Sequence, residues 1–180
     1  MKTFVYKTLF VFFLIYLLLQ FTIGAKIKQI QQGGLPVLAR KCLLAILIFM
    51  SVPLVILARA LRPIVLIRFR CLNSPRLGHY AANTELYLCE KDFGLHGPKT
   101  IDIFGVLPYV CNQFLHTKWK EHLRISRMGR ALDIANRKLP LRDAHIIPIS
   151  SDKDPHGLIK RTEPHIIFNE SENNLGESAL

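Results

Sequence analysis

Two uncharged apolar segments near the amino end constrain this 180-residue chain more than any other feature. The first covers residues 8–25 and the second covers residues 42–58. At a rise of about 1.5 Å per residue, a helix of this length is close to the thickness of a bilayer's hydrocarbon core. The sequence therefore predicts two hydrophobic membrane helices within a membrane anchor of residues 1–62.

Residues 8–25 also have an alternative interpretation as a cleaved signal peptide, because a short basic stretch precedes them. The apolar run is longer than most signal-peptide cores, and residues 22–24 (Thr-Ile-Gly) match a cleavage site only weakly. Both features favour an uncleaved anchor. A break is predicted after it, because residues 33–36 (Gly-Gly-Leu-Pro) combine strong helix breakers.

Two interpretations remain open for residues 42–58. They form either the second span of a helical hairpin or a helix that is kinked at Pro53 and lies in one leaflet. In a hairpin the outer positions would hold six of the ten nearest basic residues and the inner loop four. That distribution favours a cytoplasmic carboxyl-terminal region.

The charge of the chain is distributed unevenly. Residues 1–84 contain eleven Lys or Arg and no acidic residue, whereas residues 85–180 contain thirteen basic and thirteen acidic residues. Basic residues that flank apolar runs are explained by anionic lipid headgroups. The balanced half carries no basic stripe interleaved with aromatic residues. We therefore expect a lipid bilayer as partner and no nucleic acid.

Residues 63–168 predict a small α/β region. Short β-branched runs bounded by turn residues alternate with stretches of helical periodicity, which indicates a parallel sheet with ligand sites at the carboxyl ends of its strands. Residues 169–180 are either the start of a truncated helix or a disordered tail. The predicted strands are 64–69, 100–104 and 144–148, and the predicted helices are 80–88, 109–123 and 127–137.

The loop from Asn73 to His79 is the best candidate site, because it follows the carboxyl end of a predicted strand. Arg76 offers a fork for a phosphate or carboxylate, Gly78 lets the backbone approach a ligand, and His79 can donate a proton or a hydrogen bond. The alternative is a structural turn with an exposed arginine and a packed histidine.

Further polar residues lie on the two helices that follow. Asn83 and Glu85 can contact the hydroxyl groups of a sugar or merely solvate a helix, and Asn112 can line a cleft or form a polar edge. The four cysteines show no zinc-like spacing, so no metal site is predicted, and no catalytic residue is assigned. The predicted substrate-binding residues are Arg76, Gly78, His79, Asn83, Glu85 and Asn112.

Three sequence segments together resemble a known family. Residues 62–69 (RPIVLIRF), 74–89 (SPRLGHYAANTELYLC) and 110–120 (VCNQFLHTKWK) are similar to bacterial glycosyltransferases associated with surface-carbohydrate biosynthesis. The similarity runs from about Gly33 to Leu180. The Arg76–His79 segment and the Cys111-Asn112 pair carry most of its specificity.

This resemblance implies a Rossmann-like lobe of the GT-B type, a nucleotide-sugar donor and an enzyme of the bacterial inner membrane. Arg76, Gly78 and His79 would border the cleft on the acceptor side. Family members continue into a second lobe, where a His-x-Arg-Asp-like segment is expected to help bind the donor. We therefore expect this chain to be an incomplete, amino-terminal portion that is inactive alone.

The function expected from these features is transfer of a sugar from a nucleotide-sugar to a surface-glycan acceptor, which is often lipid-linked. No bound cofactor is expected. The alternative is a non-enzymatic membrane protein whose small α/β domain binds a partner.

Overall fold

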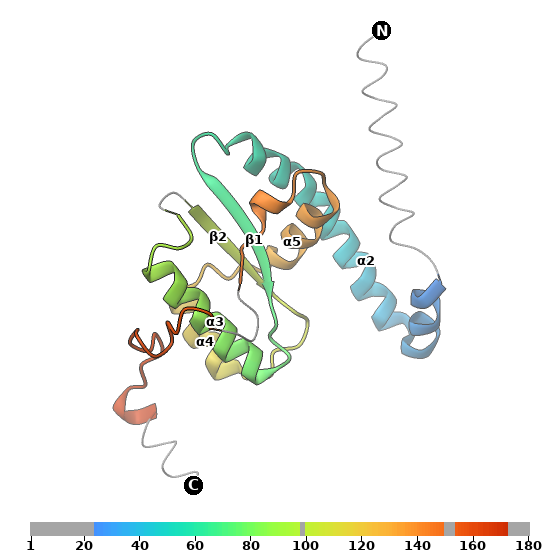
Figure 1. Ribbon diagram of the computed structural model, residues 1–180. Coiled ribbons are helices and arrows are strands. Elements are labelled where there is room, and N and C mark those ends of the chain that lie inside the picture. The colour runs from blue at the N-terminus through green and yellow to red at the C-terminus, as the bar shows by residue number, and fades with distance from the viewer. Residues whose placement is uncertain (1–23, 98–99, 150–153, 173–180) are drawn as a thin grey trace. The chain divides into compact units, whose positions relative to one another are not determined.

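The computed structural model describes residues 24–97, 100–149 and 154–172, with side chains from residue 36 onward (Figure 1). The predicted helix over residues 8–25 lies outside this part of the chain, apart from its last two residues. The chain divides into two compact units, residues 1–50 and residues 51–180. The second unit contains the α/β region and the last residues of the long helix that precedes it.

The first described element is helix α2 (Gly24–Ala60), which is 37 residues long. The break that we predicted at residues 33–36 is wrong, because the helix continues through them. Glycine costs a helix only about 1 kcal/mol relative to alanine, and a proline removes one backbone hydrogen bond.

Residues Pro36–Ala60 of α2 are long and apolar enough to cross a membrane, with a mean hydropathy of 2.5. Only 28% of this window is buried within the protein. One membrane-length helix is therefore present among the described residues, where the sequence predicted two in the whole chain. Its exposed large apolar side chains are Leu38, Leu43, Ile46, Phe49, Met50, Leu54, Ile56 and Leu57.

The α/β unit contains a small parallel sheet, so the predicted mixed α/β class is confirmed. Strand β1 (Leu66–Leu72) pairs with strand β2 (Thr100–Val106). One further parallel bridge lies on each side, where Ile146 pairs with Phe69 of β1 and Ile125 pairs with Phe104 of β2. The predicted strand over residues 144–148 is thus only a bridge, which follows the short 3-10 helix η1 (Asp143–His145).

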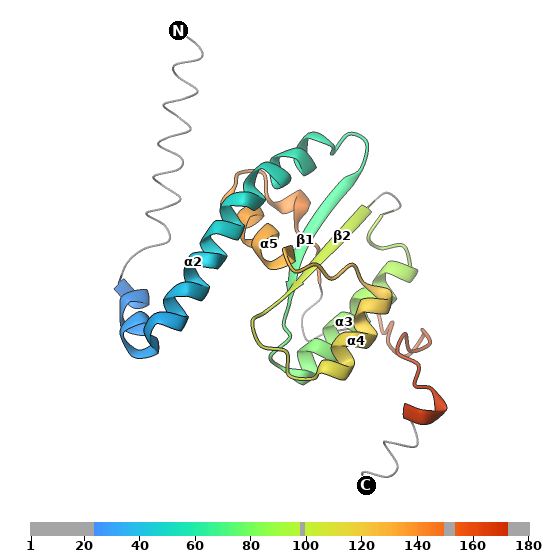
Figure 2. The same cartoon turned by 180° about the vertical axis from the view of Figure 1, so that it is seen from behind.

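Helices cover both faces of this sheet (Figures 1 and 2). Helices α3 (Leu77–Asp92) and α4 (Gln113–His122) pack on the face that carries Leu72 and Phe104. Helix α5 (Gly129–Lys138) contacts both strands, and its first residue lies against Gly105 on the opposite face. The core between the sheet and α3/α4 is built from Leu72, Tyr80, Tyr87, Leu88, Phe104, Trp119, Leu123 and Ile147.

A buried ion pair links the two strands on the α3 face. Arg68 and Asp102 are register partners, and the guanidinium donates to both carboxylate oxygens at 2.7 Å. The hydroxyl of Tyr87 donates a third bond to Asp102 at 2.5 Å. Burial, together with this hydrogen bond and the negative charge of Asp102, raises the pKa of Tyr87 far above its usual value. The tyrosine therefore remains a hydrogen-bond donor.

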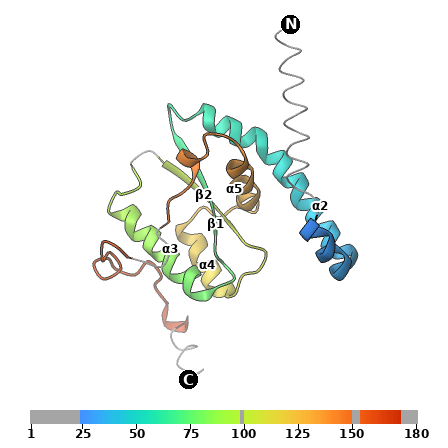
Figure 3. The same ribbon diagram turned by 45° about the vertical axis from the view of Figure 1, so that its right-hand side comes forward.

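Residues 154–172 pack along α3 and α4 (Figure 3). Phe168 stacks on Phe114 of α4 at a centroid distance of 5.9 Å, and Lys118 pairs with Glu172 at 2.9 Å. The Asn169 side chain accepts the backbone N–H of Glu172, and Glu172 accepts the N–H of Asn169, which forms a capping box. Residues 170–172 form a helical turn, within the range 169–180 where the start of a helix was predicted.

Candidate functional site

The carboxyl end of β1 is held against the loop that follows β2 by one buried serine. Ser74 donates from Oγ to the carbonyl of Tyr109 at 2.8 Å and accepts the N–H of Leu107 at 3.1 Å. Its carbonyl accepts the N–H of Cys111 at 3.0 Å. These bonds fix the point where the chain leaves the sheet and enters α3.

A pocket of about 380 Å³ opens beside the first turns of α3. One wall comes from α3 and contains three of the predicted site residues, Gly78, His79 and Asn83. The other wall comes from Asp154 and Ile159. Its volume lies within the range of small-molecule sites, which is about 300–1,000 Å³. We call this cavity the Gly78 pocket; its lining is completed by Ala82 and Leu86.

The Gly78 pocket combines an apolar surface with a few polar groups. Leu86 and Ile159 provide apolar surface, while His79, Asn83 and Asp154 provide hydrogen-bonding groups. A Cβ added at Gly78 would meet no atom within 4 Å, so the backbone of α3 is open to a ligand there. Apolar surface with convergent polar groups is the usual composition of a ligand site.

Asp154 has a second role in shaping this pocket. Its carboxylate accepts the N–H groups of Leu158 and Ile159, both at 2.9 Å. Burial acts to raise the pKa of Asp154, but these backbone hydrogen bonds outweigh it and lower the pKa. The carboxylate is therefore ionised at neutral pH, and it fixes the turn that carries Ile159.

The amino end of α3 lacks a side-chain cap. Arg76 occupies the N-cap position without a side-chain capping bond, and the first turn contains no acidic residue. The first N–H groups of a helix have no partner within the helix, and they favour a negative charge. Arg76 is exposed next to them, outside the lining of the Gly78 pocket.

The other two predicted site residues form contacts within the protein. Asn112 caps α4, because its side-chain oxygen accepts the N–H of Leu115 at 2.9 Å. Glu85 accepts two hydrogen bonds from His165, one from the backbone N–H at 3.0 Å and one from the ring at 2.9 Å. The structure thus brings Gly78, His79 and Asn83 together in one pocket and leaves Arg76, Glu85 and Asn112 outside its lining.

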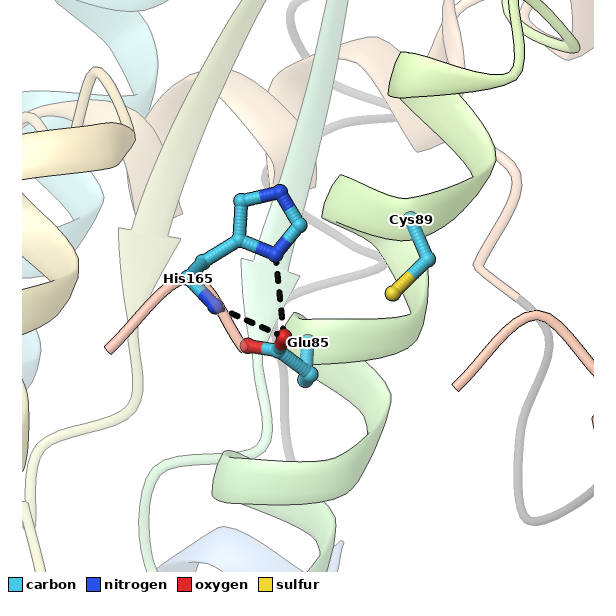
Figure 4. A group of neighbouring side chains, drawn as sticks. All are labelled: Glu85, Cys89 and His165. Atoms are coloured by element: carbon cyan, nitrogen blue, oxygen red, sulfur yellow. Dashed lines mark hydrogen bonds and ion pairs between the residues drawn. The ribbon is translucent and has the colours of Figure 1, made fainter. Parts of the chain in front are cut away.

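A second group of polar side chains lies one turn further along α3 (Figure 4). Glu85 and Cys89 come from α3, and His165 comes from the carboxyl-terminal segment. The second ring nitrogen of His165 lies 2.9 Å from a carboxylate oxygen of Asp92. Burial acts to lower the pKa of His165, but the hydrogen bonds and negative charges of Glu85 and Asp92 raise it overall.

Another pocket, of about 290 Å³, lies beside Tyr87 and Asp102. Its basic residues are Lys91, Lys120 and Arg124. It is a weaker candidate because Asp102 is already neutralised by Arg68, and because ligands of parallel sheets bind at the carboxyl ends of strands.

Sequence reasoning missed Asp154, Ile159 and His165. Residues 150–163 are polar and contain turn-forming residues, a composition typical of a loop, and nothing in their spacing indicates that they return to α3. A local signal existed only for the turn, because Asp154 is followed by Pro155 and Gly157.

We found no match to this chain among protein families, curated proteins or solved structures. The resemblance to glycosyltransferases therefore remains a prediction.

Proposed function

We propose that this chain is the membrane-anchored, acceptor-side part of a glycosyltransferase that acts on a surface glycan. The observation that carries the proposal is the Gly78 pocket, where His79, Asn83 and Asp154 surround apolar surface. A sugar ring presents hydroxyl groups at its edge and C–H groups on its faces. A pocket with carboxylate, amide and imidazole groups beside Leu86 and Ile159 is complementary to both.

The strand arrangement supports a Rossmann-like lobe. The two strands and the two parallel bridges lie in the order Ile125, β2, β1, Ile146 across the sheet. The chain therefore runs from β1 to β2 and on to Ile125, and then returns to the opposite side of β1 at Ile146. Helices α3 and α4 lie on one face of the sheet and α5 on the other. Open sheets of this kind bind ligands at the carboxyl ends of their strands, near the reversal of strand order. The Gly78 pocket follows β1, which borders this reversal.

Each polar group of the pocket has a distinct role in the proposed acceptor site. Asp154 accepts hydrogen bonds from sugar hydroxyls, and Asn83 both donates and accepts them. His79 can orient the acceptor hydroxyl group. Arg76 and the uncapped amino end of α3 attract a phosphate at the edge of the site, such as that of a lipid-linked acceptor.

Helix α2 supports attachment to the membrane. Its window from Pro36 to Ala60 is apolar and mostly exposed, and a soluble environment would leave that surface in contact with water. An anchor would confine enzyme and lipid-linked acceptor to the same plane, which raises their effective concentration. We propose the inner membrane of a bacterium, with the α/β unit on its cytoplasmic side.

The alternative of a partner-binding protein without enzymatic activity predicts that Arg76 and His79 are buried against the apolar helices. Arg76 is exposed, and His79 lines the Gly78 pocket. This arrangement favours a site that binds a small ligand, as the proposed glycosyltransferase requires, over a partner-binding protein.

Acceptor binding tests the proposed site. In the full chain reconstituted into nanodiscs, His79→Ala and Asn83→Ala should each weaken binding of a lipid-linked oligosaccharide by about tenfold, because each removes a hydrogen bond worth about 1.4 kcal/mol. Microscale thermophoresis with a fluorescent acceptor would measure the change.

Matched controls exist for both substitutions. His156→Ala and Asn73→Ala remove the same residue types from exposed positions outside the pocket lining, and they should leave acceptor affinity unchanged. Equal affinities for all four variants, or no saturable binding by the unmodified chain, would contradict the proposed site.

Membrane attachment has its own test. The full chain should remain in the pellet after extraction of membranes with alkaline carbonate, because an apolar helix of 25 residues is long enough to span the hydrocarbon core. Immunoblotting of pellet and supernatant measures the distribution. A chain found in the supernatant together with peripheral proteins would exclude the anchor.

A further inference from the structure

We propose that Glu85, Cys89 and His165 bind one zinc ion that fastens the carboxyl-terminal segment to α3. The three residues offer one carboxylate oxygen, one thiol sulfur and one imidazole nitrogen, and these atoms all lie within 4.8 Å of one another. All three side chains point toward the same space in Figure 4. This inference does not depend on the proposed sugar transfer.

The geometry of the three ligands fits a tetrahedral ion. Glu85 and Cys89 are four residues apart, so they share one face of α3. Zinc binds oxygen and nitrogen at about 2.0–2.2 Å and sulfur at about 2.3 Å, so ligand atoms around it lie about 3.3–3.8 Å apart. Oε1 of Glu85 and Nδ1 of His165 are separated by 2.9 Å. Small side-chain rotations therefore suffice to accommodate the ion.

Asp92 provides an independent indication of a metal site. Its carboxylate lies 2.9 Å from Nε2 of His165, on the side of the ring that faces away from Glu85. A histidine that binds zinc usually donates its other ring N–H to a carboxylate, which orients the ring and selects its tautomer. With the proton on Nε2, the lone pair of Nδ1 is available to the ion.

The mixed set of donors selects the class of metal. A thiolate together with an imidazole favours zinc over magnesium or calcium, which prefer oxygen ligands. Three protein ligands leave a fourth position for water. On binding, the thiol proton of Cys89 and the Nδ1 proton of His165 are released to solvent. The hydrogen bond between Glu85 and His165 is then replaced by two bonds to the ion.

Zinc at this position would stabilise one wall of the Gly78 pocket. Leu158 packs against Leu86 and Cys89, and Ile159 beside it lines the pocket. Thr162, which contacts Cys89 at 2.8 Å, links this turn to the segment that carries His165. The ion would therefore attach both the turn and the following segment to α3.

Cobalt is a suitable probe, because it occupies zinc sites and its bond to a thiolate absorbs in the near ultraviolet. The untagged full chain, purified in detergent and treated with a chelator, should bind one equivalent of Co²⁺ with this absorption. Added Zn²⁺ should abolish the absorption by displacing the cobalt. Absence of the thiolate band from the unmodified chain would overturn the proposal.

Variants identify the ligands. Cys89→Ser should eliminate the thiolate band, whereas Cys42→Ser and Cys111→Ser should retain it; loss in either control with retention in Cys89→Ser would overturn the assignment. His165→Asn should weaken Zn²⁺ binding at least tenfold in competition with a chromophoric chelator. Circular dichroism would verify that each variant is folded.

Asp92→Asn distinguishes an orienting carboxylate from an ordinary surface residue. Asp92 is exposed, so its substitution leaves the fold intact, yet loss of an orienting carboxylate typically lowers metal affinity by about 10- to 100-fold. Asp143→Asn changes another exposed aspartate and should leave the affinity unchanged. Equal Zn²⁺ affinities of Asp92→Asn and the unmodified chain would overturn the role of Asp92 and, with it, the proposed tautomer of His165.

Discussion

Replacement of Asp102 by alanine is expected to destabilise the α/β unit by about 3–5 kcal/mol. The substitution leaves the guanidinium of Arg68 buried between the strands and α3, with no carboxylate to neutralise it. It also removes the acceptor of the Tyr87 hydroxyl. The cost arises mainly from the uncompensated charge, because the side chain of Arg68 is only 7% exposed.

The contribution of the intact pair is a separate quantity. Two charges lose their hydration on burial, and their attraction offsets that loss only with good geometry. The combined substitution Arg68→Met and Asp102→Leu removes both charges at similar volume. We expect this double variant to be much more stable than Asp102→Ala, with the remaining difference from the unmodified chain reflecting the unpaired Tyr87 hydroxyl.

Urea unfolding of the full chain in detergent would measure both effects. Trp119 is the only tryptophan and is buried in the core of the α/β unit, so its fluorescence reports on this unit alone. Asp143→Ala is the control, because the Asp143 side chain is 94% exposed and its removal should leave the unfolding midpoint unchanged. An unchanged midpoint for Asp102→Ala as well would disprove the buried pair.

The pattern of apolar residues was sufficient to predict the elements of the α/β unit. Pro63 and the turn at residues 73–75 lie close to the two ends of β1. Helix α4 begins at Gln113, four residues later than the predicted helix over residues 109–123. Trp119 and Ala135, which lie within the predicted helices over residues 109–123 and 127–137, are both buried. The strand near Ile146 was predicted too long, because a run of β-branched residues does not show how much of it finds a partner.

The candidate site was less predictable, because its parts come from distant segments. Gly78 and His79 lie in the loop predicted after the first strand, and the rule for parallel sheets selected that loop. Asn83 was predicted separately, as a polar residue of the helix that follows. Glu85, in contrast, meets His165 eighty residues later in the chain. No periodicity encodes that meeting, which depends on how the segment after residue 153 returns to α3. The pairing of Arg68 with Asp102 likewise required the strand register.

Helix α2 departs from the local propensity of residues 33–36. Two glycines and a proline at these positions predict a break by their intrinsic preferences, yet the helix continues. Intrinsic preferences are weak, since glycine costs a helix only about 1 kcal/mol relative to alanine. The preferences of single residues are therefore less reliable within the apolar segments than in the α/β unit.

Replacement of Gly129 by alanine should destabilise the α/β unit by about 1–3 kcal/mol or more, since overpacking against backbone cannot be relieved by side-chain rotation. An added Cβ would overlap the carbonyl group of Phe104, where α5 begins directly on β2.

Gly78→Ala is the matched control, because its Cβ would project into open space. Alanine is favoured over glycine in a helix by about 0.5–1 kcal/mol, so this variant should be as stable as the unmodified chain or slightly more so. Both variants are measured by urea unfolding with Trp119 fluorescence. Equal stabilities of Gly129→Ala and Gly78→Ala would contradict the structure. They would mean that an added methyl group meets no more resistance at the start of α5 than in open space, so α5 would not approach β2 as closely as the structure requires.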